Sequence, residues 1–174
     1  MSLYSVKALL ILDSKGKRIV AKYYPQIEDE FGAEKEKEAF EKSLWEKTHK
    51  SSSDIALFNK YIVVYKSAAD LIFYVIGDQH ENELILWSIL NSYYDAISIL
   101  LRGLIDKRMV LENLDYVLIA LDELIDGGIL FETDPDEIAQ RTALKSSEEV
   151  PIAEQDIKQF SKTATDAVLR FLRN

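Results

Sequence analysis

Two histidines and a run of serines are the first residues to test for chemistry. His49 and His80 are the only histidines in the sequence, and neither has further ligands at a spacing that metal sites use. The string KSSSD at 50–54 offers a serine nucleophile, but no G-x-S-x-G elbow surrounds it. We therefore expect surface histidines and a polar loop, with no metal site and no serine hydrolase site.

Three carboxylates, Asp122, Glu123 and Asp126, are the remaining candidates for acid/base work. Such a pair needs a buried setting that separates two pKa values, whereas these residues fall at the end of a predicted amphipathic helix. Gly127 and Gly128 follow that helix instead of opening one, which is the wrong polarity for a phosphate cradle. The sequence predicts no catalytic residue, no cofactor and therefore no enzyme.

Composition limits the class of protein and the kind of partner. The 174 residues are 48% hydrophobic and include no cysteine, so one domain with an appended terminal segment can form without disulfides. The formal charge of −9 disfavours nucleic acid and anionic lipid as direct partners. The absence of cysteine is compatible with a reducing compartment, and we expect the cytosol. The apolar run after Lys7 is too short for a secretory signal or a membrane span, so we expect any membrane association to be indirect.

Five strands are expected, and they must position whatever site exists. Residues 3–24 predict two strands around a turn at Gly16, and residues 54–78 predict three more, with turns at 59–60 and 67–70. The first strand is apolar on both faces, which indicates a sheet covered on two sides. One predicted face holds Val6, Ala8, Leu10 and Leu12, and the other holds Leu9 and Ile11.

Helical periodicity predicts an amphipathic helix over 33–49 and two further helices over 83–103 and 112–125. The predicted order is ββαβββαα, an α+β fold. SSEEVP, from Ser146, has the composition of a linker. The predicted division is a domain over 1–145 and an extension over 146–174, whose amphipathic helix has an apolar stripe of Ile157, Phe160, Ala164, Val168 and Phe171.

The helix over 83–103 is more apolar than a one-sided surface helix needs to be. The middle of its apolar arc, Leu86, Leu90, Tyr93, Ile97 and Leu104, is predicted to pack on the sheet. A second cover is needed by the flank of Trp87, Tyr94, Leu101 and Ile105. That cover is either the following helix, with its stripe of Leu114, Leu118, Leu121 and Ile125, or a partner protein, since aromatic residues rimmed by polar ones are typical of interface centres.

Several strings in this order resemble the zeta subunits of coatomer, the small chains of the COPI vesicle coat. They are LYSVKALLILDSKGKRIVAKYY at 3–24, FEKSLWEKT at 40–48 and DLIFYVIGDQHENELIL at 70–86. The resemblance is strongest in YDAISILLRGLIDKRMVLENLDYVLIALDELIDGGILFETDP at 94–135. It covers almost the whole chain.

The resemblance implies a longin-like fold, a five-stranded antiparallel sheet sandwiched by helices, and a non-catalytic coat subunit in the cytosol. It implies pairing with the amino-terminal helical trunk of the gamma coatomer subunit and contact with other coatomer subunits. An Arf-family GTPase would recruit the complex, which would lie peripherally on Golgi membranes and COPI vesicles and serve Golgi-to-ER and intra-Golgi transport.

Two alternatives remain open. Sigma chains of clathrin adaptors resemble this sequence and help to bind dileucine signals, but Asp106, Lys107 and Arg108 bring charge where an apolar lining would be needed, so that site is not carried over. A small hydrolase or ligand-binding domain is the alternative from another class, although the sequence lacks convergent polar groups for it.

Overall fold

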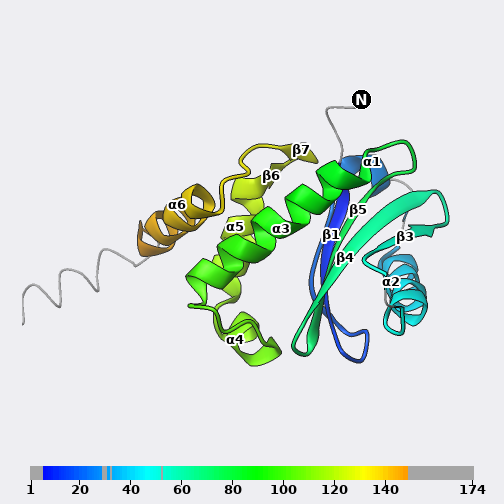
Figure 1. Cartoon of the computed structure of the whole chain (residues 1–174), viewed down its shortest axis with the longest axis horizontal. Helices are drawn as coiled ribbons and strands as arrows, with labels where there is room; N and C mark the ends of the chain where they lie inside the picture. The colour runs from blue at the N-terminus through cyan, green and yellow to red at the C-terminus, as the bar shows by residue number, and fades with distance from the viewer. Residues whose placement is uncertain (1–5, 29–30, 32, 52, 149–174) are drawn as a thin grey trace, which may run out of the picture.

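A five-stranded antiparallel sheet forms the centre of the molecule (Figure 1). The computed structural model describes residues 6–28, 31, 33–51 and 53–148. The strands lie in the order β2-β1-β5-β4-β3. Their bounds are Val6–Asp13 for β1, Arg18–Tyr23 for β2, Ile55–Phe58 for β3, Tyr61–Ala68 for β4 and Leu71–Asp78 for β5. The predicted five-stranded sheet and its connection order are confirmed.

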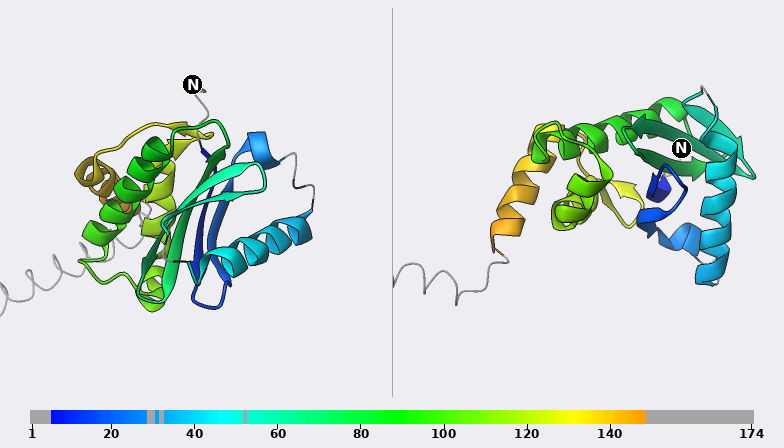
Figure 2. Two further views of the ribbon diagram at one scale, coloured as in Figure 1. Left: turned by 45° about the vertical axis from the view of Figure 1, so that its right-hand side comes forward. Right: turned by 90° about the horizontal axis from the view of Figure 1, so that it is seen from below.

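Helices cover both faces of this sheet (Figure 2). Helix α2, Glu34–Thr48, packs on one face, while α3, Glu83–Leu100, and α5, Leu114–Leu124, pack on the other. Helix α6, Pro135–Glu148, contacts α3 and α5. Two short helices, α1 over Pro25–Glu28 and α4 over Lys107–Glu112, lie in connections. The sandwich follows from strands whose two faces are both apolar.

Strand β1 shows both the success and the failure of the face prediction. Ala8, Leu10 and Leu12 pack on the α2 side, and Leu9 and Ile11 pack under α3 and α5. Val6 joins Leu9 and Ile11 instead of Ala8, so its predicted face is wrong. The register shifts there, because Val6 pairs with Gly77 and Ala8 with Ile76. This bulge makes Lys7 an extra residue and reverses the alternation.

The β1–β2 turn depends on Gly16, as the sequence predicts. Its φ is +77°, a conformation that residues with a Cβ rarely adopt. A Cβ at this position would also lie 2.8 Å from the ring of Trp45 on α2. The turn therefore packs directly on the helix that covers this face of the sheet.

The helix predicted over 112–125 is α5, and a short helix that was not predicted, α4, precedes it. Asp106 begins α4 by accepting a hydrogen bond from the Met109 amide at 2.8 Å, and Asn113 interrupts the run with φ −127° and ψ 39°. Helix α5 ends at Leu124, before the predicted stop. Gly127 and Gly128, with φ of +55° and +90°, form the turn between β6, Ile125–Asp126, and β7, Ile129–Leu130.

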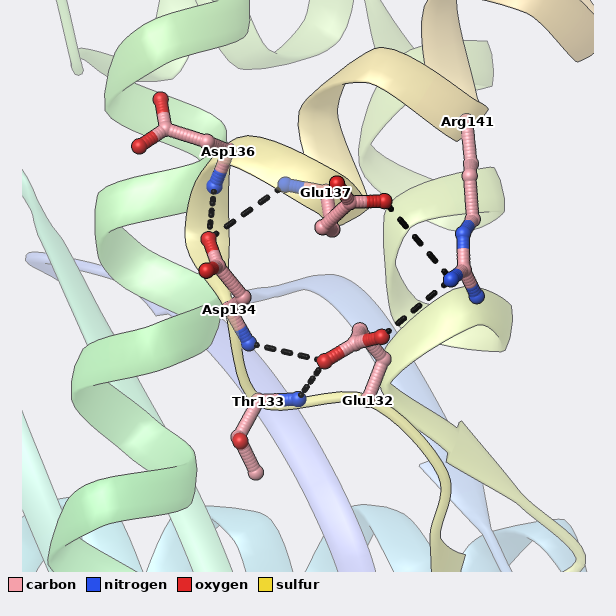
Figure 3. Close-up of polar contacts among 6 residues, drawn as sticks. All are labelled: Glu132, Thr133, Asp134, Asp136, Glu137 and Arg141. Atoms are coloured by element: carbon pink, nitrogen blue, oxygen red, sulfur yellow. Dashed lines mark hydrogen bonds and ion pairs between the residues drawn. The ribbon is translucent and has the colours of Figure 1, made fainter.

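Helix α6 was not predicted, although its start carries a clear signal. Asp134 precedes Pro135, a residue favoured in a first helical turn, and its carboxylate accepts from the amides of Asp136 at 2.9 Å and Glu137 at 3.4 Å (Figure 3). The helix continues to Glu148, into the predicted linker that begins at Ser146. The rest of that linker and the predicted terminal helix lie outside the described residues.

Candidate partner interface

The chain itself covers part of the flank predicted to need a second cover. Leu101 and Ile105 are buried in the core formed with α4 and α5, so the prediction that they face a partner is wrong. The predicted stripe on the following helix contributes Leu121 and Ile125 to that core, whereas Leu118 is exposed.

Leu104 is exposed as well, contrary to its predicted place on the sheet. Helix α3 ends at Leu100, and Arg102 and Gly103 have φ of +56° and +80°. The amide of Gly103 donates to the Ser98 carbonyl at 2.7 Å, which closes the helix end. Helical spacing therefore no longer decides where the side chain of Leu104 points.

Trp87 and Tyr94 are half-buried on the side of α3 that faces β4. The ring of Tyr94 meets Phe73 edge to face, with centroids 5.6 Å apart, and the Lys66 ammonium lies 4.0 Å from the Tyr94 ring centroid. Lys66 also donates to Asn91 at 3.0 Å. These contacts hold the outer side of α3 in a fixed position against β4.

Strand β3 extends this surface beyond β4. Ile55 is 42% exposed and Leu57 is 61% exposed. They pair with Val64 and Ile62, which belong to the core beneath α3, so Ile55 and Leu57 lie on the α3 side of the sheet. Helix α3 does not extend over them.

We call these residues the β3–α3 surface. Its α3 members lie three and seven residues apart and thus share one side of the helix, beginning with Leu84, which is 72% exposed. The β3–α3 surface consists of Ile55, Leu57, Leu84, Trp87 and Tyr94. Two of the four residues predicted as an interface belong to it.

The free edge of β3 is partly closed to strand addition. The Ser53 hydroxyl donates to the Ile55 carbonyl at 2.8 Å and accepts from the Ile55 amide at 3.3 Å. The Lys47 ammonium donates to the Leu57 carbonyl at 2.6 Å. Side chains that occupy an edge in this way oppose pairing with another strand, so the β3–α3 surface favours a partner that docks through side chains.

The segment whose charge argued against a dileucine site is tied to the sheet. Lys107 donates to Asp13 at 2.8 Å through its ammonium and to Asp70 at 2.8 Å through its amide. Arg108 pairs with Glu112. A hollow of about 480 Å³ lies here, and four of its five lining residues are charged; they are Asp70, Lys107, Arg108, Leu111 and Glu112. Most of the surface that these residues present to the hollow is nevertheless apolar, so the charge of this segment does not by itself exclude leucine side chains.

The residues first tested for chemistry are separated in the structure. His49 stacks on Trp45, with ring centroids 4.0 Å apart, while His80 lies in the exposed turn before α3. Asp122 pairs with Lys22, and the buried Glu123 pairs with Lys145. Among residues 6–28, 31, 33–51 and 53–148, no group of three or more histidine, aspartate or glutamate side chains could hold a metal ion.

Sequence reasoning missed Ile55, Leu57 and Leu84 as surface candidates. The alternation along IALF at 55–58 places Ile55 and Leu57 on one face, but it does not show that α3 stops short of that face. Leu84 directly follows the first helical residue, and its exposure depends on how α3 is turned against the sheet.

Comparison with known proteins places this architecture in a family. The family model for the clathrin adaptor complex small chain matches residues 5–149. A solved assembly, described as a homology model of the full-length AP-3 complex in a stretched open conformation, contains a similar chain. It has a TM-score of 0.62 and 17% identity, and the match covers 88% of this chain and 98% of that one. At this identity the likeness shows the fold.

Sequence relatives narrow the assignment. Coatomer subunit zeta-1 of Homo sapiens is 46% identical over 167 residues, which cover 96% of this chain and 92% of the relative. Coatomer subunit zeta-1 of Arabidopsis thaliana is 43% identical over 172 residues, with 96% of each chain covered. The chain therefore belongs to the clathrin adaptor complex small-chain family, and within it to the coatomer zeta subunits.

Proposed function

We propose that this chain is a non-catalytic subunit of the COPI vesicle coat that pairs with the amino-terminal helical trunk of the gamma coatomer subunit. The observation that carries the proposal is the similarity to coatomer zeta subunits over 96% of the chain. The exposed apolar β3–α3 surface supports it, because such a surface on a small domain is typical of a protein interface.

The trunk docks on the β3–α3 surface through side chains. Burial of one large apolar side chain contributes about 1.5–3 kcal/mol, so Leu57, Leu84 and Ile55 together supply enough favourable energy to matter in a stable complex. The occupied backbone groups at the β3 edge favour an α-helical partner over a strand. The surface binds without making or breaking a covalent bond.

Attachment to Golgi membranes is peripheral and occurs through the complex, which an Arf-family GTPase recruits together with the other coatomer subunits. In this setting the chain supports Golgi-to-ER retrograde and intra-Golgi transport. The formal charge of −9 opposes direct adhesion to anionic lipid. Within the part of the chain that the structure describes, no helix has the length and apolar character needed to cross a bilayer.

Co-expression with the gamma trunk tests the pairing. We expect a stoichiometric complex on size exclusion, and a chain that elutes alone beside the trunk would contradict the proposal. Leu57→Asp and Leu84→Asp each weaken the complex by about tenfold or more, because each buries a charge in the interface. Leu111→Asp, on exposed α4, is the matched control.

The variants separate two kinds of failure. If Leu111→Asp disrupts the complex while Leu57→Asp and Leu84→Asp leave it intact, the trunk binds elsewhere and the β3–α3 surface is the wrong interface. If the wild-type chain ignores the trunk, the pairing itself is wrong. Circular dichroism of each variant confirms that the exposed substitutions leave the fold unchanged.

A further inference from the structure

A groove opens at the far end of α3 from the start of the β3–α3 surface. It has a volume of about 710 Å³. Its walls come from the end of α3, from α4 and α5, and from α6. The lining includes Ile99, Arg102, Met109, Asn113 and Tyr116, and Ile99 and Arg102 are exposed.

One face of α6 forms the remaining wall. Asp136, Ala139, Gln140 and Ala143 all line the groove, and their spacing of three and four residues places them on one side of the helix. Two of them are alanines, which allow another backbone to approach closely. An occupant that runs along α6 would meet a small-residue surface with a carboxylate at its beginning.

The chain continues from this wall. Ala143 precedes the end of α6 at Glu148 by five residues, about 7 Å of helical rise. Pro151 follows soon afterwards and disfavours a direct continuation of the helix. The eight residues 149–156 can span up to about 27 Å, which is enough to bring the chain back over the groove.

The sequence of residues 149–174 has the pattern that the groove requires. Its apolar stripe from Ile157 to Phe171 would extend about 21 Å as a helix, similar to the length of α6. Phe160 and Phe171 provide bulk, and Ala164 provides a position for close approach to the alanines of α6. A stripe of this kind needs an apolar surface to cover it.

Charge favours an antiparallel arrangement. The segment is acidic at its beginning, with Glu149, Glu154 and Asp156, and basic at its end, with Arg170 and Arg173. Helix α6 has the same order, since its first turn contains Asp136 and Glu137 and its last turn contains Lys145. An antiparallel segment therefore places each charged end against its opposite.

Asp136 is the groove-lining anion available for such a contact. In Figure 3 its carboxylate points away from the network in which Glu132 and Glu137 pair with Arg141, at 3.3 and 3.7 Å. Its backbone amide, and not its carboxylate, takes part in the Asp134 cap. An arginine from the end of the segment can reach this carboxylate without breaking the cap.

We propose that residues 157–173 of the same chain form an amphipathic helix that lies in this groove, antiparallel to α6, with Phe160 and Phe171 facing Ile99, Met109 and Tyr116. The segment thus covers its own domain and leaves the β3–α3 surface free for a partner. This docking is independent of the pairing proposed above.

Disulfide trapping in the full chain tests the docking, and the natural sequence has no cysteine to interfere. The variant Gln140→Cys/Ala164→Cys joins the groove wall to the apolar stripe. Its matched control, Gln140→Cys/Lys162→Cys, uses a residue on the opposite side of the segment. We expect intramolecular oxidation of the first variant to be about tenfold faster or more, because docking raises the effective concentration of the two thiols.

A second substitution checks that the groove is responsible. Ala143→Arg fills the groove and should remove the rate difference, whereas Leu144→Arg, at the next exposed position, should preserve it. Intact mass with and without reductant measures each product. Equal rates for the two cysteine pairs overturn the proposal. Disulfide-linked dimers also overturn it, since the segment then occupies a second copy. A rate difference that appears only when the gamma trunk is present overturns it as well.

Discussion

Asp13 offers the sharpest test of the packing that holds α4 to the sheet. Its carboxylate is buried at the end of β1 and accepts from the amides of Lys15 at 2.9 Å and Lys17 at 2.8 Å. The Lys107 ammonium donates to its other oxygen at 2.8 Å. Asp13→Asn keeps an oxygen for the two amides but turns an NH₂ group toward Lys107, so the ionic contact is lost.

The size of this loss follows from the geometry. A hydrogen bond to a charged group contributes about 1.5–3 kcal/mol. The Lys107 side chain is 37% exposed and can regain water, so the lower part of that range applies. We expect Asp13→Asn to lower the free energy of unfolding by about 2 kcal/mol. For a domain of this size that corresponds to a fall in Tm of about 4–8 °C.

Urea unfolding followed by circular dichroism measures the effect, with Glu46→Gln on the exposed side of α2 as the control. In a Lys107→Met background the cost of Asp13→Asn should fall by about 2 kcal/mol, because the contact is already absent. If Asp13→Asn and Glu46→Gln both remain within about 0.5 kcal/mol of wild type, the proposed contribution of this contact is wrong.

The same group gives a pH dependence with a defined sign. Burial acts to raise the pKa of Asp13, but the Lys107 hydrogen bond and the two amides outweigh it, so the pKa lies below its ordinary value of 3.8. A folded-state pKa that is lowered stabilises the protein above the unfolded pKa. The stability difference between wild type and Asp13→Asn should therefore be constant above about pH 5 and shrink as the pH falls below about 4.

Two further substitutions test other parts of the fold. Gly16→Ala should lower the free energy of unfolding by about 2–4 kcal/mol, because the new side chain has an unfavourable positive φ and overlaps Trp45. Gly103→Ala should cost only about 1 kcal/mol, because Gly103 has a φ of +80° but open space around it. Equal midpoints of urea unfolding for the two variants would contradict this. Tyr93→Phe removes the buried hydroxyl that donates to the Val117 carbonyl at 2.8 Å and should cost about 1–2 kcal/mol. Tyr116→Phe is its control on α5, and an equal effect of the two would argue against a role for the buried hydrogen bond.

Local sequence patterns were sufficient for much of the fold. The turn at Gly16 and the double-sided burial of β1 follow from rules that act over a few residues. The face of Val6 was predicted wrongly because a bulge is a property of two paired strands, which the sequence of one strand does not reveal. Helix α6 was not predicted for a different reason. The signal at Asp134 and Pro135 was present, but the following residues are polar enough to resemble a connection.

For the candidate interface, too, some features follow from the sequence and others only from the tertiary structure. Sequence alone determined that α3 is too apolar for a single cover and that Trp87 and Tyr94 lie on its flank. Only the tertiary structure decided that Leu101 and Ile105 are buried within their own domain. It also decided that Ile55 and Leu57, distant from α3 in sequence, extend the β3–α3 surface. Periodicity records the direction of a side chain about its own helix or strand, whereas exposure depends on which other element arrives above it. That depends on contacts between residues far apart along the chain.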